Sequence, residues 1–341
     1  MSRIAGLVCF ALFGVAAILA SMPQAFAEDE LKVAVVQGAR WETAAAELGQ
    51  NAGIFKKFGI VLDFEYVADA EEVRQSVISG AAVIGLGVSA MAAMQAYERG
   101  APIRIIGANL AGSVNYWYVL KSSPVRSYKD IAGKTLAYER NGSSSHFDAI
   151  DFTKQFRLKA KLAPTGGEAL TLQQLKSGEI DVGWAAPPFG LEEIGQDVIR
   201  VVARANDVPN IRKKTVSVMI ANAGFLQKHK DVVGRFVWAY RKSVDWMYSD
   251  PAAVQRYAEL AGVSSDVASR LRDQFFTKEM LLPETIVGLN AIIKDADALA
   301  YLRKALSRKQ LRDLIQIPTG SDARSSCSGG AGIRCWLGIA P

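Results

Sequence analysis

The sequence predicts an α/β protein with mixed sheets flanked by helices and with enough residues for two domains. Three observations support this prediction. Strand and helix patterns alternate from Leu31 to Gly107, a second α/β unit follows from Asn115, and an almost entirely helical region runs from Asn222 to about Gln316. Strands that alternate with helices pair mostly in parallel, and the helices cover both faces of the sheet.

The first unit has four short strand patterns separated by helix patterns. The expected strands are Leu31–Val36, Ile60–Tyr66, Ala82–Gly87 and Ile103–Gly107. The first helix is expected from about Glu42 to Asn51. The second has apolar residues at helical spacing and ends at Gly80, and the third begins at Ser89. We therefore expect a mostly parallel sheet here.

The second unit begins with an apolar, aromatic strand from Asn115 to Lys121. The elements expected after it are strand Lys134–Tyr138, helix Ser144–Phe156, helix Glu168–Ser177, and strands Ile180–Trp184, Val198–Ala203 and Thr215–Ala221. The following region is predicted to be helical until Pro318 ends it.

The N-terminus has the pattern of a secretory signal peptide. Arg3 precedes an apolar run from Ile4 to Ala20, and small residues at Ala25 and Ala27 mark a cut near Ala27. We expect residues 1–27 to be removed and the mature chain to begin near Glu28 in the periplasm. The alternative is an uncleaved membrane anchor, since the run is only just long enough to span a bilayer. Cys9 lies too early in the run for a lipidation site.

The segment from Thr319 to Pro341 is rich in Gly, Ser and Ala and has no apolar period, so we expect residues 319–341 to be disordered. Cys327 and Cys335 in this segment are the only cysteines besides Cys9, and they could form a disulfide in an oxidising compartment.

Composition excludes several classes of protein. The net charge of +6 is modest, and no stripe of Lys and Arg with interleaved aromatics is visible, so no nucleic-acid partner is expected. The folded region has no cysteine and only two histidines, His146 and His229, so neither a metal site nor a cofactor is predicted. No nucleophile elbow and no phosphate-binding loop occurs. We therefore predict a binding protein without catalytic activity, with a secreted enzyme as an open alternative.

Several motifs together indicate a family. The segments Val77–Gly87 and Leu175–Trp184 have the same pattern, a helix that ends at a glycine followed by a short buried strand. With Gly53–Ile60 (GIFKKFGI) and Asp130–His146 (DIAGKTLAYERNGSSSH), the chain resembles the nitrate-, taurine- and alkanesulfonate-binding branch of bacterial ABC-transporter solute-binding proteins. That branch shares a domain with thiamine-pyrimidine-binding and pyrimidine-synthase proteins. The resemblance covers about Leu31 to Pro318.

This resemblance implies a two-lobed periplasmic-binding-protein fold of type II with a ligand cleft between the lobes. Lobe 1 would contain residues 28–112 and 216–318, and lobe 2 residues 113–215. Ligand binding would close the lobes, and the closed monomer would deliver its ligand to an ABC permease with an ATPase subunit. The implied ligand is a small organic or inorganic anion. An aminopyrimidine or an aromatic acid is the alternative, and a binding protein that reports to a sensor is another.

Candidate ligand-binding residues follow from the rule that open α/β sheets bind ligands beyond the carboxyl ends of their strands. The residues selected are Gln37, Trp41, Ser89, Asn115, Gly142, Ser143, Ser144, Ser145, Trp184 and Pro187. The Gly142–Ser145 run follows a strand and opens a helix, where backbone N–H groups and hydroxyls can hold an anion. Simple N-capping explains the same serines equally well, and also Ser89.

The aromatic and charged candidates also have two interpretations each. Trp184 and Trp41 are predicted to be walls of the site, with core packing as the alternative. Arg40 could bind a carboxylate or sulfonate, but its position slightly favours a solvated turn residue. Glu42 beside it argues against a site for anions alone. Glu192 and Glu193 are read as a solvated helix face, with an amine or aminopyrimidine contact as the alternative.

Overall fold

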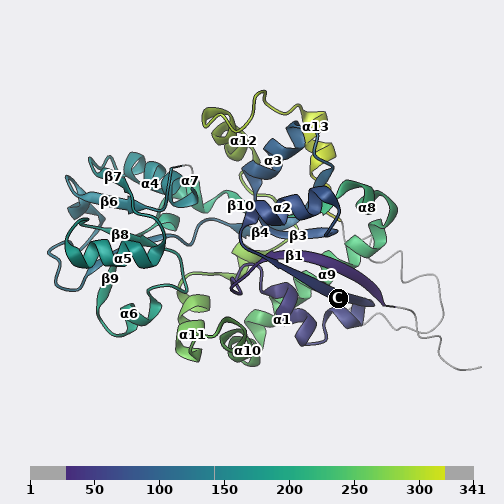
Figure 1. The fold of residues 1–341 in the computed structure, drawn as a ribbon, viewed down its shortest axis with the longest axis horizontal. Helices are drawn as coiled ribbons and strands as arrows, with labels where there is room; N and C mark the ends of the chain where they lie inside the picture. The colour runs from purple at the N-terminus through teal and green to yellow at the C-terminus, as the bar shows by residue number, and fades with distance from the viewer. Residues whose placement is uncertain (1–27, 142, 319–341) are drawn as a thin grey trace, which may run out of the picture.

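The computed structural model describes residues 28–141 and 143–318, which form two groups of strands and helices joined by crossing segments (Figure 1). The predicted signal peptide (1–27), the predicted tail (319–341) and Gly142 lie outside the described residues. We call the group around the five-stranded sheet lobe 1 and the group around the two smaller sheets lobe 2. This two-lobed α/β architecture confirms the predicted fold class. Within the described residues, no helix is both long and apolar enough to cross a membrane.

Lobe 1 is built on a mixed sheet with the strand order β2-β1-β3-β10-β4. The strands are β1 (Asp29–Val36), β2 (Ile60–Val67), β3 (Ile84–Ser89), β4 (Ile103–Ala111) and β10 (Thr215–Asn222). The strand β1 runs parallel to both β2 and β3, whereas β10 is antiparallel to both β3 and β4. The four strands of the first unit therefore all run in the same direction, as expected, and β10, which follows lobe 2 in the sequence, inserts antiparallel between β3 and β4.

Helices cover both faces of this sheet because its central strands are apolar on both sides. Val33 and Val35 belong to one buried cluster and Ala34 to the other, as the alternation of side chains along a strand requires. One face carries α2 (Ala70–Ser79), α3 (Ala90–Glu98), α12 (Leu289–Ala298) and α13 (Arg308–Leu314). The opposite face carries α1 (Ala45–Asn51), η1 (Phe55–Phe58), α9 (Lys230–Ser249) and α10 (Ala252–Ala261), with α8 (Ala223–Lys228) beside them (Figure 1).

Lobe 2 has two small sheets. The strand β5 (Tyr116–Leu120) pairs antiparallel with β8 (Gly183–Ala185) and β9 (Ile199–Arg204), and β6 (Thr135–Tyr138) pairs in parallel with β7 (Lys161–Pro164). A single bridge between Leu136 and Val182 connects the two sheets. The helices of this lobe are η2 (Tyr128–Ile131), α4 (Ser144–Gln155), α5 (Glu168–Ser177), α6 (Leu191–Gly195), η3 (Ala205–Asp207) and α7 (Pro209–Arg212).

The two lobes are joined where the chain crosses between them twice. The N–H of Gly112 on one crossing segment donates to the carbonyl of Lys214 on the other at 2.7 Å. The predicted lobe boundaries at 112/113 and 215/216 fall at this crossing, and we keep them as a proposal.

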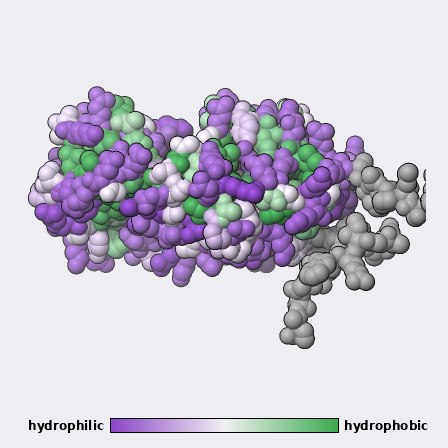
Figure 2. Space-filling model, turned by 90° about the horizontal axis from the view of Figure 1, so that it is seen from below, coloured by the Kyte–Doolittle hydropathy of each residue, from purple (hydrophilic) through white to green (hydrophobic). Residues whose placement is uncertain are grey.

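A third connection comes from α11 (Ser265–Gln274) and the segment after it, which precede η4 (Lys278–Leu281). Arg204 of lobe 2 donates to the Gln274 carbonyl at 2.6 Å, and the Phe275 ring lies 5.3 Å from the Tyr116 ring. The helical C-terminal region therefore contacts both lobes. Hydrophilic residues cover most of the lower face of the molecule (Figure 2).

Candidate functional site

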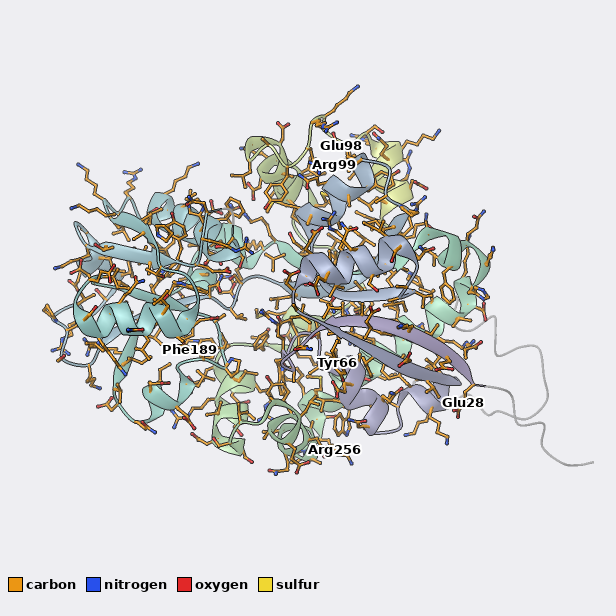
Figure 3. All side chains as sticks on the ribbon, viewed as in Figure 1. Glu28, Tyr66, Glu98, Arg99, Phe189 and Arg256 are labelled. Atoms are coloured by element: carbon orange, nitrogen blue, oxygen red, sulfur yellow. The ribbon has the colours of Figure 1, made fainter. Side chains whose placement is uncertain are left out.

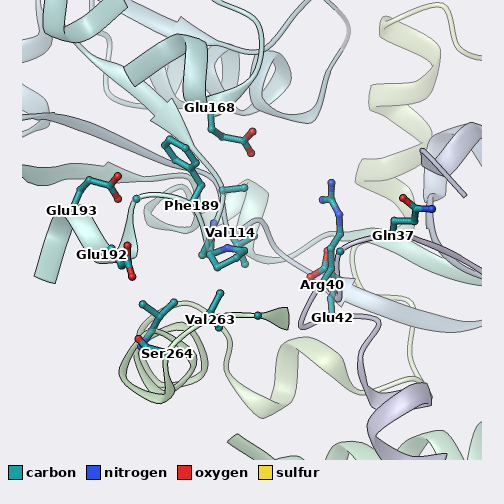
Figure 4. Close-up of a pocket in the computed structure, with 17 residues that line it drawn as sticks. Gln37, Arg40, Glu42, Val114, Glu168, Phe189, Glu192, Glu193, Val263 and Ser264 are labelled. Carbon is teal, nitrogen blue, oxygen red and sulfur yellow. The ribbon is translucent and has the colours of Figure 1, made fainter. Parts of the chain in front are cut away.

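A cleft of about 570 Å³ lies between the two lobes and is lined by three walls and by Val114 of the first crossing segment. The first is the segment after β1, the second combines the start of α5 with the segment from Ala186 to Glu193, and the third is the connection between α10 and α11. The side chains from these parts point toward a common space (Figure 4). A volume of this size suits a small-molecule ligand.

The lobe 1 side of the cleft is a turn that follows β1. The Gln37 N–H donates to the Val67 carbonyl at 3.0 Å, which keeps the turn attached to β2. Gly38 has a φ of 95°, a conformation that side-chain-bearing residues rarely adopt. The turn continues into Arg40, whose carbonyl accepts from the N–H groups of Thr43 and Ala44. Gln37 and Arg40 are exposed toward the cleft.

Glu42 lies deeper in the same wall. Burial raises the pKa of its carboxyl, and the Arg40 guanidinium and the residue's own backbone N–H counteract this only in part. Its carbonyl is fixed by a hydrogen bond from the Tyr240 hydroxyl at 2.7 Å. The two charged side chains of this wall, Arg40 and Glu42, therefore lie within each other's electrostatic influence.

The lobe 2 side is formed by the chain that leaves β8. A cis peptide bond joins Pro187 to Pro188, and the Phe189 carbonyl then accepts a hydrogen bond from the buried Tyr116 hydroxyl. The Phe189 side chain is half-buried and lies on the lower part of lobe 2 (Figures 3 and 4). Gly190 has a φ of 77° and turns the chain into α6.

Three carboxylates accompany Phe189 on this side. Glu192 and Glu193 lie in the first turn of α6, and Glu168 lies in the first turn of α5. Glu168 and Glu193 are half-buried. Burial raises the pKa of Tyr118, and the negative charges of Glu193 and Glu168 raise it further. Both carboxylates therefore act on the same buried phenol, which places their charges in one region of lobe 2.

The third wall comes from a sharp turn between α10 and α11. Gly262 has a φ of 65°, Val263 is half-buried in the cleft wall, and the Ser264 hydroxyl caps α11 by accepting from the Val267 N–H at 3.2 Å. The contacts of the α11 region with lobe 2, from Gln274 to Arg204 and from Phe275 to Tyr116, hold this turn in place.

Two of the predicted ligand-binding residues, Gln37 and Pro187, line this cleft. The indoles of Trp41 and Trp184 are instead buried, with 1% and 5% of their surface exposed. Trp41 donates to the Tyr248 hydroxyl at 3.1 Å, and Trp184 donates to the Gly166 carbonyl at 3.3 Å. Each indole is packed in the core and neither lines the cleft of this structure, so their contact with a ligand stays a prediction.

The predicted hydroxyl residues are engaged in local hydrogen bonds outside the cleft lining. The Ser89 and Ser143 hydroxyls cap α3 and α4, and the buried Ser145 hydroxyl accepts from the Glu139 N–H at 2.9 Å. Ser144 is exposed. The buried Asn115 side chain donates to Asp148 at 2.7 Å. A ligand role for these residues and for Gly142, which lies outside the described residues, also stays a prediction.

Sequence reasoning did not select the α10–α11 turn or Glu168. The rule of strand ends cannot find them, because the turn follows a helix and Glu168 begins one. The cleft is also lined by four charged residues for which the sequence pattern favours solvated positions, since they occur in a turn or a first helical turn: Arg40, Glu42, Glu192 and Glu193. The sequence signal for a charged cleft is the occurrence of Glu42, Glu192 and Glu193 soon after predicted strands, together with Arg40.

Comparisons with known proteins agree with the fold. Residues 26–254 match the family described as NMT1/THI5 like. The solved structure of a sulfonate ABC transporter periplasmic sulfonate-binding protein from Methylobacillus flagellatus has a TM-score of 0.68 at 19% identity, covering 89% of this chain and 96% of that chain. The periplasmic aliphatic sulphonate binding protein from Escherichia coli has a TM-score of 0.66 at 17% identity, covering 85% and 92%.

A curated relative is an enzyme. The chain is 23% identical over 238 residues to 4-amino-5-hydroxymethyl-2-methylpyrimidine phosphate synthase from Aspergillus parasiticus, covering 65% of this chain and 68% of the relative. The similarity to the solved binding proteins shows the fold alone. The similarity in sequence is to a synthase.

Proposed function

Because the chain belongs to the NMT1/THI5-like family, we propose that it is the periplasmic solute-binding component of an ABC importer. The observation that supports this best is the cleft of about 570 Å³, lined by both lobes and by the α10–α11 turn. A solute held there contacts both lobes at once, so its binding favours their closure. The closed protein, exported by its N-terminal signal, would then dock on an ABC permease.

The cleft offers one cationic group for the anionic ligand predicted from sequence. Arg40 presents a guanidinium from lobe 1, and Gln37 beside it supplies an amide. A guanidinium can bind a carboxylate or sulfonate through two parallel hydrogen bonds. We therefore propose that the ligand carries an acidic group and that Arg40 binds it.

The synthase relative makes an enzyme the second candidate. Among the described residues that line the cleft, none is a histidine, cysteine or lysine, and the one hydroxyl side chain, Ser264, caps a helix. Glutamates are the only lining groups suited to proton transfer. These side chains favour a binding role.

Binding is tested with protein that starts at Glu28 and is screened by thermal shift and calorimetry against alkanesulfonates, taurine, nitrate, aromatic acids and aminopyrimidines. We expect saturable, stoichiometric binding of at least one acid-bearing compound, with a smaller radius of gyration in solution scattering. Arg40→Gln should weaken that binding about tenfold or more, since a charge-assisted hydrogen bond is lost. Arg99→Gln, at the exposed residue that follows α3, is the matched control. Turnover of a compound at catalytic protein concentrations would refute the binding role.

A further inference from the structure

The charge of the cleft is mainly negative, although the protein as a whole is positive. Its lining contains four carboxylates, from Glu42, Glu168, Glu192 and Glu193, and one guanidinium, from Arg40. The whole chain has a net charge of +6. Since a random sample of this surface would be basic, the acidic lining is a specific feature of the cleft.

The lobe 2 carboxylates have no protein partner of opposite charge. In residues 28–141 and 143–318, no ion pair or side-chain hydrogen bond is recorded for Glu168, Glu192 or Glu193, although fifteen ion pairs form elsewhere. Arg40 lies on the opposite side of the cleft, beside Glu42 (Figure 4). The three lobe 2 carboxylates and Phe189 surround one part of the cavity.

Such an arrangement favours a cationic group of a ligand. Like charges repel more strongly where solvent is partly excluded, and Glu168 and Glu193 are both half-buried. Both carboxylates also lie near enough to the buried Tyr118 to add to the effect of burial, which raises the pKa of that phenol. A cation in this part of the cavity would neutralise the repulsion, and the face of the Phe189 ring would add to its binding.

We propose that the ligand carries a basic nitrogen group, which binds between Glu168, Glu192 and Glu193 beside Phe189, in addition to the acidic group that Arg40 binds. This inference rests on the proposed function, because it concerns the same cleft. It restricts the ligand to dipolar compounds, so alkanesulfonates and nitrate, which have no basic nitrogen, are poor ligands. The acidic end contacts lobe 1 and the basic end contacts lobe 2, so a dipolar ligand connects the lobes.

Matched pairs of compounds that differ only in the basic nitrogen test the specificity. Suitable pairs are taurine with ethanesulfonate, β-alanine with propionate, and 4-aminobenzoate with benzoate; the aromatic amine, which is weakly basic, serves as a graded case. We expect the aliphatic amine of a pair to bind at least tenfold more tightly than its partner, as for a charge-assisted contact. Equal affinity within every pair that binds would overturn the inference and leave the proposed function intact.

Charge-removing variants test the role of the two half-buried carboxylates. The double variant Glu168→Gln, Glu193→Gln should reduce the preference for the amine to less than about threefold, and it should not weaken the binding of the amine-free compound of the pair. Glu179→Gln, which removes one negative charge at an exposed site of lobe 2, should leave both affinities unchanged.

The two proposals fail in different ways. If no compound of the pairs or of the wider screen binds, the proposed function fails, and the inference that depends on it fails with it. Tight binding of a purely anionic compound that is unaffected by the double variant would contradict the inference alone.

Discussion

Asp148 is the buried ionisable residue with the clearest consequence for stability. It lies on α4 and accepts hydrogen bonds from the Ser113 hydroxyl at 2.5 Å and from the Asn115 side chain at 2.7 Å, both on the first crossing segment. Burial raises its pKa from 3.8 to about 6, against the lowering effect of these two hydrogen bonds. The protonated carboxyl is thus favoured in the folded state.

The pH dependence follows from this shift. Because the folded-state pKa exceeds the unfolded one, the stabilising contribution is complete below pH 3.8 and is lost as the pH rises through about 6. The loss amounts to about 3 kcal/mol for a shift of this size. Asp148→Asn should remove this component, so urea unfolding at pH 4 and pH 7.5 should show a smaller decrease in stability than the wild type. Parallel pH profiles for the two proteins would contradict the assignment, and Asp63→Asn, at an exposed site, should leave the profile unchanged.

For single residues, the sequence predicted the position along a strand or helix but not the hydrogen-bond partners. Ser143 and Ser145 occur where an anion site and a helix cap have the same local pattern, and the hydrogen bonds of the folded chain are those of a cap and a loop. For Trp184, the position at a strand end was predicted correctly, but the direction of the indole depends on Gly166, which lies 18 residues earlier. Local pattern contains no information on such partners.

Among the elements, α1 depends on a very close approach to α9. A Cβ atom placed on Gly49 would lie 1.8 Å from the Ser243 hydroxyl and 2.6 Å from the Ser243 Cβ, so Ser243 or the backbone would have to move. The Ser243 hydroxyl already donates to the Ala239 carbonyl at 2.8 Å. Gly49 is therefore required for packing and not for its backbone conformation.

Gly49→Ala should destabilise the protein by about 1–3 kcal/mol, the usual cost of overpacking, despite the higher helix propensity of alanine. Chemical denaturation measures the change. Gly224→Ala is the control, since its Cβ would make only an ordinary 3.4 Å contact in the exposed helix α8, and it should be neutral or slightly stabilising. Equal effects of the two substitutions would show that α1 can move away from α9 at little cost.

The order of the elements was largely predictable, but their neighbours were not. The expected helix Glu168–Ser177 coincides with α5, and the strand expected at Thr215–Ala221 corresponds to β10. The short strand β7 was not predicted, because Lys161–Pro164 is partly exposed and ends in proline. The insertion of β10 between β3 and β4 joins segments more than 100 residues apart, and no local periodicity determines such a pairing.

For the whole molecule, the family resemblance predicted the two lobes and a cleft between them, and the rule of strand ends found two of the walls. The third wall was missed because α11 reaches lobe 2 through contacts such as that of Phe275 with Tyr116. These contacts join residues far apart in the sequence. The chemistry of the cleft depends on such long-range contacts, since they bring Val263 and Ser264 opposite Arg40 and Phe189 (Figure 4).

Lys214 lies at the crossing and forms an ion pair with an aspartate of each lobe. Its Nζ is 3.3 Å from Asp151 on α4 of lobe 2 and 2.5 Å from Asp295 on α12 of lobe 1. Burial alone would lower the pKa of Lys214, but the two carboxylates outweigh it and raise the pKa, so the ammonium is kept charged. In the view of Figure 1, α4 and α12 lie above the crossing segments, whereas α6 and α11, which border the cleft, lie below them. In the proposed function, a rotation that closes the cleft would separate Asp151 from Asp295, and the contacts of Lys214 would oppose it.

Lys214→Met should accordingly have opposite effects on stability and on binding. Loss of two partly buried ion pairs should lower the free energy of unfolding by about 1–2 kcal/mol. Removal of the contacts that oppose closure should raise the affinity for a cleft ligand about threefold, although Lys214 does not line the cleft, because closure needs less free energy. Calorimetry and urea unfolding measure the two effects. Lys134→Met breaks an ion pair with Asp181 that lies within lobe 2 and should leave the affinity unchanged. A decrease in affinity for Lys214→Met would mean that Lys214 stabilises the closed arrangement, which would reverse the role inferred here.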